Sequence, residues 1–239
     1  MEEVHDLLAY PHLKIVQRDD LFKFSLDSIL LARFVTLHYR TKKILDIGTG
    51  NAPIPLVLST RTKAHITGVE LQKESATLAE KSVRLNHLEQ QIMIMNQDIH
   101  DFYKTNESDQ YDVITCNPPY FKYQEHSIVN DKEGKTTARH ESSLSLEDVC
   151  KIAKKLLKNN SRLALVHRTE RLMDILFCMR ECHIEPKRIC FIYPYKGKES
   201  NLVLIEGTKN GKPGLKLLDP LYVYDASQHY TKEIEQYFK

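Results

Sequence analysis

The chain has 239 residues, of which 41% are hydrophobic and 28% charged, and its formal net charge is +2. These values are typical of one large globular domain, and a charge so close to zero excludes nucleic-acid binding through overall charge alone. The sequence has no apolar run that could span a bilayer and no signal-peptide pattern at its start, which predicts a cytoplasmic protein that does not enter a membrane. The five cysteines are irregularly spaced, so we expect free thiols and no metal site.

Short apolar segments alternate with segments of helical periodicity after residue 40. The expected strands are 43–47, 64–69, 92–95, 111–115 and 162–166, with a closing hairpin-like pair at 187–193 and 202–206. The expected helices are 53–59, 73–88, 147–158 and 171–182, and Ser145 is the expected N-cap of the third. This order predicts an α/β fold with a mostly parallel sheet that is covered by helices on both faces.

A glycine-rich turn follows the first expected strand. Gly48 and Gly50 allow the backbone to turn sharply and to lie close to a flat ligand. Glu70 closes the next strand, where its carboxylate could accept both hydroxyls of a ribose. In parallel sheets, ligands bind outside the carboxyl ends of the strands. The sequence therefore predicts a site for a nucleoside cofactor at this edge.

Two nucleoside cofactors fit this layout, and the turn discriminates between them. NAD needs helix N–H groups facing its pyrophosphate, whereas Pro53 and Pro55 each lack an N–H. S-adenosylmethionine has no phosphate, and its sulfonium and amino group favour a carboxylate such as Asp46. We therefore expect S-adenosylmethionine as the cofactor. Asp98 could accept a hydrogen bond from the adenine amino group or simply cap a helix. Asp27 could cap a helix over the pocket or contact the cofactor.

The fourth expected strand runs into Asn117-Pro118-Pro119-Tyr120. The lone pair of an aromatic amine or amide nitrogen is delocalised, so this nitrogen attacks a methyl group only when it becomes more tetrahedral. The side-chain carbonyl of Asn117 and the backbone carbonyl of Pro118 could each accept one of its N–H groups. Tyr120 could stack on the substrate ring. Such catalysis depends on positioning and electrostatics and needs no metal.

These motifs, in this order, resemble those of the class I S-adenosylmethionine-dependent methyltransferases. Residues 22–32 and 138–141 are similar to segments of the tRNA(Val) adenine-N6-methyltransferase family, and the similarity extends from about Arg18 to the C-terminus. The resemblance implies a Rossmann-like fold with a seven-stranded, mostly parallel sheet that ends in an antiparallel hairpin. It also implies methylation of the adenine just 3′ of the anticodon. Two departures are Ala52 in place of a third glycine and the lack of an appended RNA-binding domain.

The expected domain layout is a helical lead-in at 1–40, which covers the cofactor site, and one catalytic unit at 41–239. We expect RNA, and tRNA in particular, as the partner of a monomer. The open alternatives are methylation of adenine or guanine in ribosomal RNA, methylation of a release-factor glutamine, and RNA binding without catalysis.

The catalytic candidates are Asn117, Pro118 and Tyr120. The cofactor candidates are Asp27, Asp46, Gly48, Gly50, Glu70, Leu71, Asp98 and Asn117. The substrate candidates are Pro119, Phe121, Lys122, Arg139 and His140.

Overall fold

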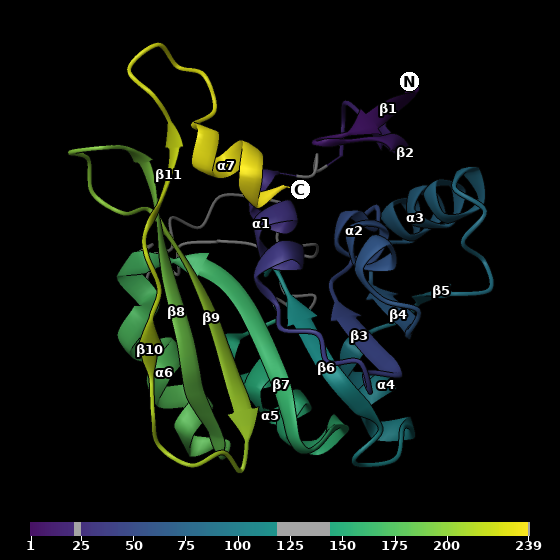
Figure 1. Ribbon diagram of the computed structural model, residues 1–239. Coiled ribbons are helices and arrows are strands. Elements are labelled where there is room, and N and C mark those ends of the chain that lie inside the picture. Colours follow the sequence, from purple (N-terminus) through teal and green to yellow (C-terminus); the bar gives the residue numbers. More distant parts are fainter. Residues whose placement is uncertain (22–24, 119–143, 239) are drawn as a thin grey trace, which may run out of the picture.

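The computed structural model describes residues 1–21, 25–118 and 144–238. Its centre is a nine-stranded sheet in the order β10-β8-β9-β7-β6-β3-β4-β5, with β11 paired to β8 (Figure 1). Seven of these strands form the expected core. The short strands β10 (Lys216–Leu217) and β11 (Leu221–Tyr224) both pair with β8 and were not predicted.

The parallel half of the sheet is built around β3. The strands β3 (Lys43–Ile47), β4 (His65–Glu70), β5 (Ile92–Asn96) and β6 (Tyr111–Cys116) all run in one direction. Their carboxyl ends therefore meet at one edge of the sheet, which we call the carboxyl edge. This edge is where the sequence predicted the cofactor site.

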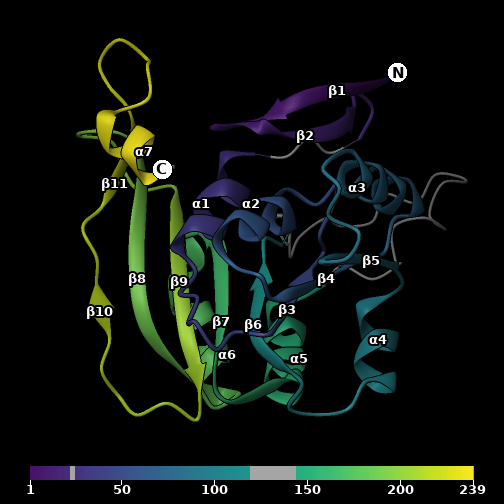
Figure 2. The same ribbon diagram turned by 45° about the vertical axis from the view of Figure 1, so that its right-hand side comes forward.

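The other half contains the antiparallel hairpin. The strand β7 (Leu157–Arg168) runs parallel to β6, and β9 (Leu202–Lys209) is antiparallel both to β7 and to β8 (Ile184–Tyr195). The last strand of the core is thus inserted between the two strands that precede it (Figure 2). Because β8 is parallel to β7, its end also lies at the carboxyl edge. The expected hairpin of a seven-stranded sheet is confirmed.

Helices cover both faces of the sheet. One hydrophobic cluster joins α1 (Leu26–Phe34), α2 (Pro53–Arg61) and the end of α3 (Lys73–Leu85) to one face. A second cluster joins α4 (Ile99–Thr105), α5 (Leu146–Leu156) and α6 (Leu172–Glu181) to the other. Strand alternation produces this division, since Ile44 belongs to the first cluster and Leu45 to the second. A short 3-10 turn, Thr169–Arg171, precedes α6, and α7 (Lys232–Tyr237) lies beyond β11.

The N-terminal lead-in differs from the prediction. Residues 2–18 are not helical but form an antiparallel hairpin of β1 (Glu2–Leu7) and β2 (Tyr10–Arg18), and among the described residues before β3 the helix is α1. The reason is a period of two in β2, where Leu13 and Ile15 are buried and Lys14 between them is exposed. Ser82 of α3 accepts the Val16 N–H at 2.9 Å and so anchors the hairpin beside the carboxyl edge.

The part of the chain that the structure describes contains no helix that is long and apolar enough to cross a membrane. The same residues bring together no group of three histidine, cysteine or acidic side chains with the geometry of a metal site.

Candidate active site at the carboxyl edge

The loop between β3 and α2 has a left-handed backbone at alternate positions. The φ angles are +67° at Gly48, +58° at Gly50 and +71° at Ala52. A Cβ atom added at Gly48 or Gly50 would meet nothing within 4 Å. A flat ligand could therefore approach the loop backbone at both glycines, which is the contact that the sequence predicted. Ala52 adopts the same left-handed conformation, at the position where the family pattern often has a third glycine.

Glu70 closes this loop from the end of β4. One carboxylate oxygen accepts the Gly50 N–H at 2.8 Å, and the other accepts the Gln72 N–H at 2.9 Å. The side chain is buried, with 8% of its surface exposed. Glu70 thus fixes the shape of the glycine loop, and each oxygen retains lone pairs that could accept a ribose hydroxyl. The neighbouring Leu71 is 47% exposed at the same edge, where it could cover the adenine ring.

Asp46 has a different role from the one expected. Its side chain has no exposed surface, and its two oxygens accept hydrogen bonds from Thr49 Oγ1 at 2.7 Å and Thr115 Oγ1 at 2.6 Å. Burial raises the pKa of Asp46 to about 7 against the opposing effect of these hydroxyls, and the charge of Glu70 adds to the rise. A direct contact between this carboxylate and a cofactor does not fit this burial. Instead, Asp46 ties the glycine loop to β6.

Asp98 occupies the N-cap position of α4. Its Oδ1 accepts the His100 N–H at 2.8 Å, so the helix-cap interpretation holds. The side chain remains partly exposed at the end of β5, next to the strand that carries Glu70. Both roles are therefore compatible, because a capping carboxylate has a second oxygen that could accept an adenine N–H.

Asn117 lies directly after β6, at the centre of the carboxyl edge. Its side-chain Nδ2 donates to Ser28 Oγ at 3.0 Å, across 89 positions of sequence. Ser28 is 4% exposed and belongs to α1. Sequence reasoning missed Ser28, since its only signal is that a small polar residue interrupts an apolar helix. The buried Pro118 follows Asn117 and continues the chain out of the strand.

Asp27 precedes Ser28 in the first turn of α1. It was a candidate for the cap of this helix, but the N-cap residue is Ser25. Asp27 is half-buried and remains a candidate for contact with the cofactor. The remaining candidates, Pro119, Tyr120, Phe121, Lys122, Arg139 and His140, lie outside the described residues.

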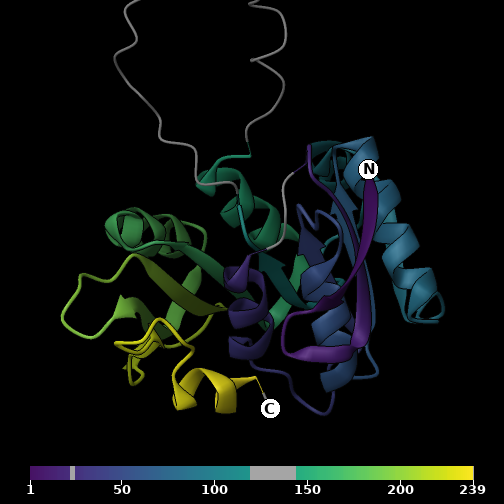
Figure 3. The same ribbon diagram turned by 90° about the horizontal axis from the view of Figure 1, so that it is seen from above.

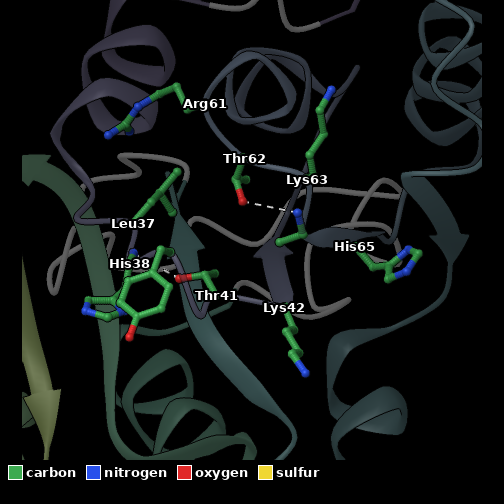
Figure 4. Close-up of a pocket in the computed structure, with 10 residues that line it drawn as sticks. Leu37, His38, Thr41, Lys42, Arg61, Thr62, Lys63 and His65 are labelled. Carbon is green, nitrogen blue, oxygen red and sulfur yellow. Dashed lines mark hydrogen bonds between the residues drawn. The ribbon is translucent and has the colours of Figure 1, made fainter.

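Three groups of basic side chains in the described part of the chain bear on RNA binding. Arg188 pairs with the buried Glu206 at 3.4 Å and lies over the Phe34 ring, so it stabilises the fold. Lys196 and Lys198 are exposed in the turn after β8, at the carboxyl edge. A hollow of about 530 Å³ with Lys42 and Lys63 on its wall lies at the opposite end of β3 and β4 (Figure 4). Only the second group shares an edge with Asn117.

The fold and this edge define the class of the protein. A solved structure described as a predicted O-methyltransferase from Agrobacterium tumefaciens superposes with a TM-score of 0.71 at 20% identity, covering 89% of this chain and 95% of that one. A S-adenosylmethionine-dependent O-methyltransferase from Thermotoga maritima covers 80% of this chain and 68% of its own, with a TM-score of 0.54 and 17% identity. These likenesses show a class I methyltransferase fold.

The family follows from sequence. The model of the methyltransferase small domain matches residues 24–176, so the chain belongs to the methyltransferase small domain family. The tRNA1(Val) (adenine(37)-N6)-methyltransferase of Mannheimia succiniciproducens is 30% identical over 218 residues, which cover 88% of this chain and 84% of that protein. The enzyme of the same name from Parabacteroides distasonis is 28% identical over 90% of this chain and 84% of its own. The expected family resemblance is confirmed.

The cofactor of this family, S-adenosylmethionine, fits the carboxyl edge. The glycine backbones leave room for a flat ligand, and Glu70 and Asp98 offer carboxylate oxygens at the ends of adjacent strands. Asn117 follows the strand on the other side of β3. A ligand that spans from β5 to β6 over the glycine loop would thus bring its reactive end to Asn117.

Proposed function

We propose that the chain transfers a methyl group from S-adenosylmethionine to N6 of an adenine in tRNA, at the position next to the anticodon. The reaction type is supported by the Asn117 side chain, which lies at the carboxyl edge beside the glycine loop and Glu70. The substrate is supported by the relatives, whose names specify adenine 37 of tRNA1(Val) and which match most of this chain.

S-adenosylmethionine supplies an electrophilic methyl group when it is bound. Asn117 accepts one N–H of the adenine amino group through its side-chain carbonyl, and the Pro118 backbone carbonyl accepts the other. These two acceptors draw the nitrogen lone pair out of conjugation and direct it toward the methyl group. The Asn117 side chain is held by Ser28 before the substrate arrives, so it stabilises the developing charge with little reorganisation.

We propose roles for the remaining candidates on the same basis. Glu70 accepts hydrogen bonds from the ribose hydroxyls, and Leu71 covers the adenine of the cofactor. Asp98 accepts a hydrogen bond from the amino group of this adenine. Tyr120 and Pro119 stack on the flipped target base, while Phe121, Lys122, Arg139 and His140 hold the surrounding RNA. The enzyme works as a cytoplasmic monomer, in which residues 41–239 form one catalytic unit.

The relatives do not favour methylation of ribosomal RNA or of a release factor, and methyl transfer distinguishes these substrates directly. The purified chain is incubated with labelled S-adenosylmethionine and, separately, with total tRNA, ribosomal RNA and a release factor, followed by nucleoside analysis. N6-methyladenosine in tRNA, lost with Asn117→Ala, is the expected result. Label in either other pool would reject tRNA as the substrate. Cofactor binding with no label in any pool would favour RNA binding without catalysis.

A further inference from the structure

Gln17 of β2 carries a buried side-chain Nε2 atom that has no hydrogen-bond partner in the described part of the chain. Its residue surface is 8% exposed, and its Nε2 atom has no acceptor among the described residues. A buried donor without an acceptor costs free energy, so native proteins rarely retain one. A ligand that brings an acceptor to this atom would remove that cost.

The position of β2 brings this amide close to the glycine loop. The Val16 carbonyl, one residue before Gln17, accepts a hydrogen bond from Asn51 Nδ2 at 2.9 Å. Asn51 follows Gly50 directly in the loop. The hairpin that carries Gln17 is therefore attached to the loop over which the cofactor lies. Figure 3 looks down on this edge and shows the hairpin passing beside α1 and α2.

Gln17 lies on the same face of β2 as Ile15. Residues two apart in a strand share a face, and Ile15 belongs to the hydrophobic cluster that contains residues of both helices. Both helices begin at the carboxyl edge. Ser28 lies in the first turn of α1, and α2 begins after the glycine loop. Gln17 is thus a buried residue that directly follows the Val16 contact with the glycine loop.

The layout of the site selects one acceptor on the cofactor. Glu70 and Asp98, on β4 and β5, suit the ribose and adenine, because their oxygens accept hydrogen bonds. The methyl group must face Asn117 after β6. In S-adenosylmethionine the ribose, the methyl group and the amino-acid end are all bonded to one sulfur atom. The amino-acid end therefore lies between the other two groups, over β3 and its loop. Its carboxylate is the strongest acceptor there for an amide N–H.

We infer that Gln17 is a cofactor-binding residue whose side-chain amide donates to the carboxylate of S-adenosylmethionine. This inference rests on the family's cofactor and not on the identity of the methylated substrate. The buried amide discriminates between ligands that have the amino-acid end and ligands that lack it. It also explains why the hairpin is attached to the loop through Asn51.

The test measures binding, so it is independent of any methyl-transfer assay. Calorimetry gives the Kd of S-adenosylhomocysteine and of methylthioadenosine, which lacks the amino-acid end, for the wild type and Gln17→Met. We expect the substitution to raise the Kd of S-adenosylhomocysteine about tenfold to a hundredfold, as for the loss of one hydrogen bond to a charged group. The Kd of methylthioadenosine stays unchanged. Gln17→Glu, which places a negative charge at the same point, weakens S-adenosylhomocysteine further.

Gln91 provides a matched control. Its Nε2 donates to the Thr62 and Ala64 carbonyls at 2.7 and 3.1 Å, far from the carboxyl edge. Gln91→Met should lower the Tm of the ligand-free protein and leave both Kd values unchanged, whereas Gln17→Met should leave this Tm equal or higher. The inference is overturned if Gln17→Met leaves the Kd of S-adenosylhomocysteine unchanged, if it weakens both ligands equally, or if it lowers Tm as the control does.

Discussion

Asn117 Nδ2 lies 3.0 Å from Ser28 Oγ, so the residue proposed to activate the substrate is held by a helix that precedes the whole sheet in the sequence. The two ends of a planar amide point in different directions. A hydrogen bond at Nδ2 therefore turns the carbonyl oxygen of Asn117 away from the Ser28 hydroxyl. In the proposed reaction, this orientation would leave the acceptor end of the amide to face the adenine nitrogen, so that α1 would contribute to the geometry of the reaction.

Substitution of Ser28 should affect the chemical step more than binding. Ser28→Ala removes this hydrogen bond from the Asn117 amide, and we expect kcat to fall about tenfold while the Kd of S-adenosylmethionine stays unchanged. Asn117→Ala, which removes the acceptor itself, should lower kcat by about 10²–10³. Single-turnover methyl transfer and calorimetry separate the two quantities.

The control for Ser28 is Ser25→Ala in the same segment. Ser25 is the N-cap of α1 but makes no side-chain cap hydrogen bond, so this substitution should leave kcat unchanged. An equal loss in both variants would mean that the helix position, and not the Asn117 hydrogen bond, determines the rate.

Asp46 should make stability depend on pH. Its pKa is raised by burial to about 7, so between pH 4 and 7 the folded state holds a proton that the unfolded state has lost. Stability from this group is full below the unfolded pKa and is lost as the pH rises through 7. Between pH 4 and 8, urea unfolding should show that the free energy of unfolding of the wild type falls by about 4 kcal/mol relative to that of Asp46→Asn. Parallel curves for the two proteins would contradict this assignment.

Gly68 in β4 makes room for Thr49 of the glycine loop. A Cβ at Gly68 would lie 2.9 Å from both Thr49 Cγ2 and Oγ1, closer than ordinary van der Waals contact allows. We expect Gly68→Ala to cost about 1–3 kcal/mol of unfolding free energy and to weaken cofactor binding. The double variant with Thr49→Ala should recover part of both losses, as measured by a double-mutant cycle. Strictly additive effects would refute the steric explanation.

Glu70→Gln should weaken cofactor binding at nearly constant shape. Glu70 now accepts hydrogen bonds from the backbone N–H groups of Gly50 and Gln72. The substitution places an NH₂ group opposite one of these two donors. We expect the Kd of S-adenosylmethionine to rise at least about tenfold, because a charged acceptor is lost for both the loop and the ribose. Glu74→Gln on the exposed side of α3 is the control and should bind normally.

Lys196 and Lys198 should contribute to RNA binding through phosphate. Both are exposed at the same edge as Asn117, so replacing both with alanine should weaken tRNA binding and reduce the slope of log Kobs against log salt by about two. Lys42→Ala with Lys63→Ala, at the opposite end of the strands, should leave the slope unchanged. The reverse result would place the RNA on the other edge.

The sequence predicted the parallel strands, the hairpin and most helices because each carries its own local pattern. Ser145 is an example, since its hydroxyl accepts the Asp148 N–H at 3.1 Å in the capping box, and the expected cap is confirmed. Interactions between distant residues could not be predicted in this way. The burial of β2 depends on α3, and Ser28 meets Asn117 only after the sheet forms.

Asp46 shows a second limit of local pattern. Its place at the end of β3 is the same whether the carboxylate faces a ligand or two hydroxyl groups. The choice depends on Thr115, which lies 69 positions away on β6. A carboxylate in a motif therefore has a predictable position but not a predictable direction.

The insertion of β9 between β7 and β8 has a consequence for synthesis on the ribosome. β7 ends at Arg168, but the partner for its free edge does not begin until Leu202. While the intervening segment is made, an apolar strand edge stays unpaired and can recruit a similar edge from a neighbouring nascent chain. The newborn protein is thus most vulnerable to aggregation after its cofactor half is complete and before its last central strand has emerged.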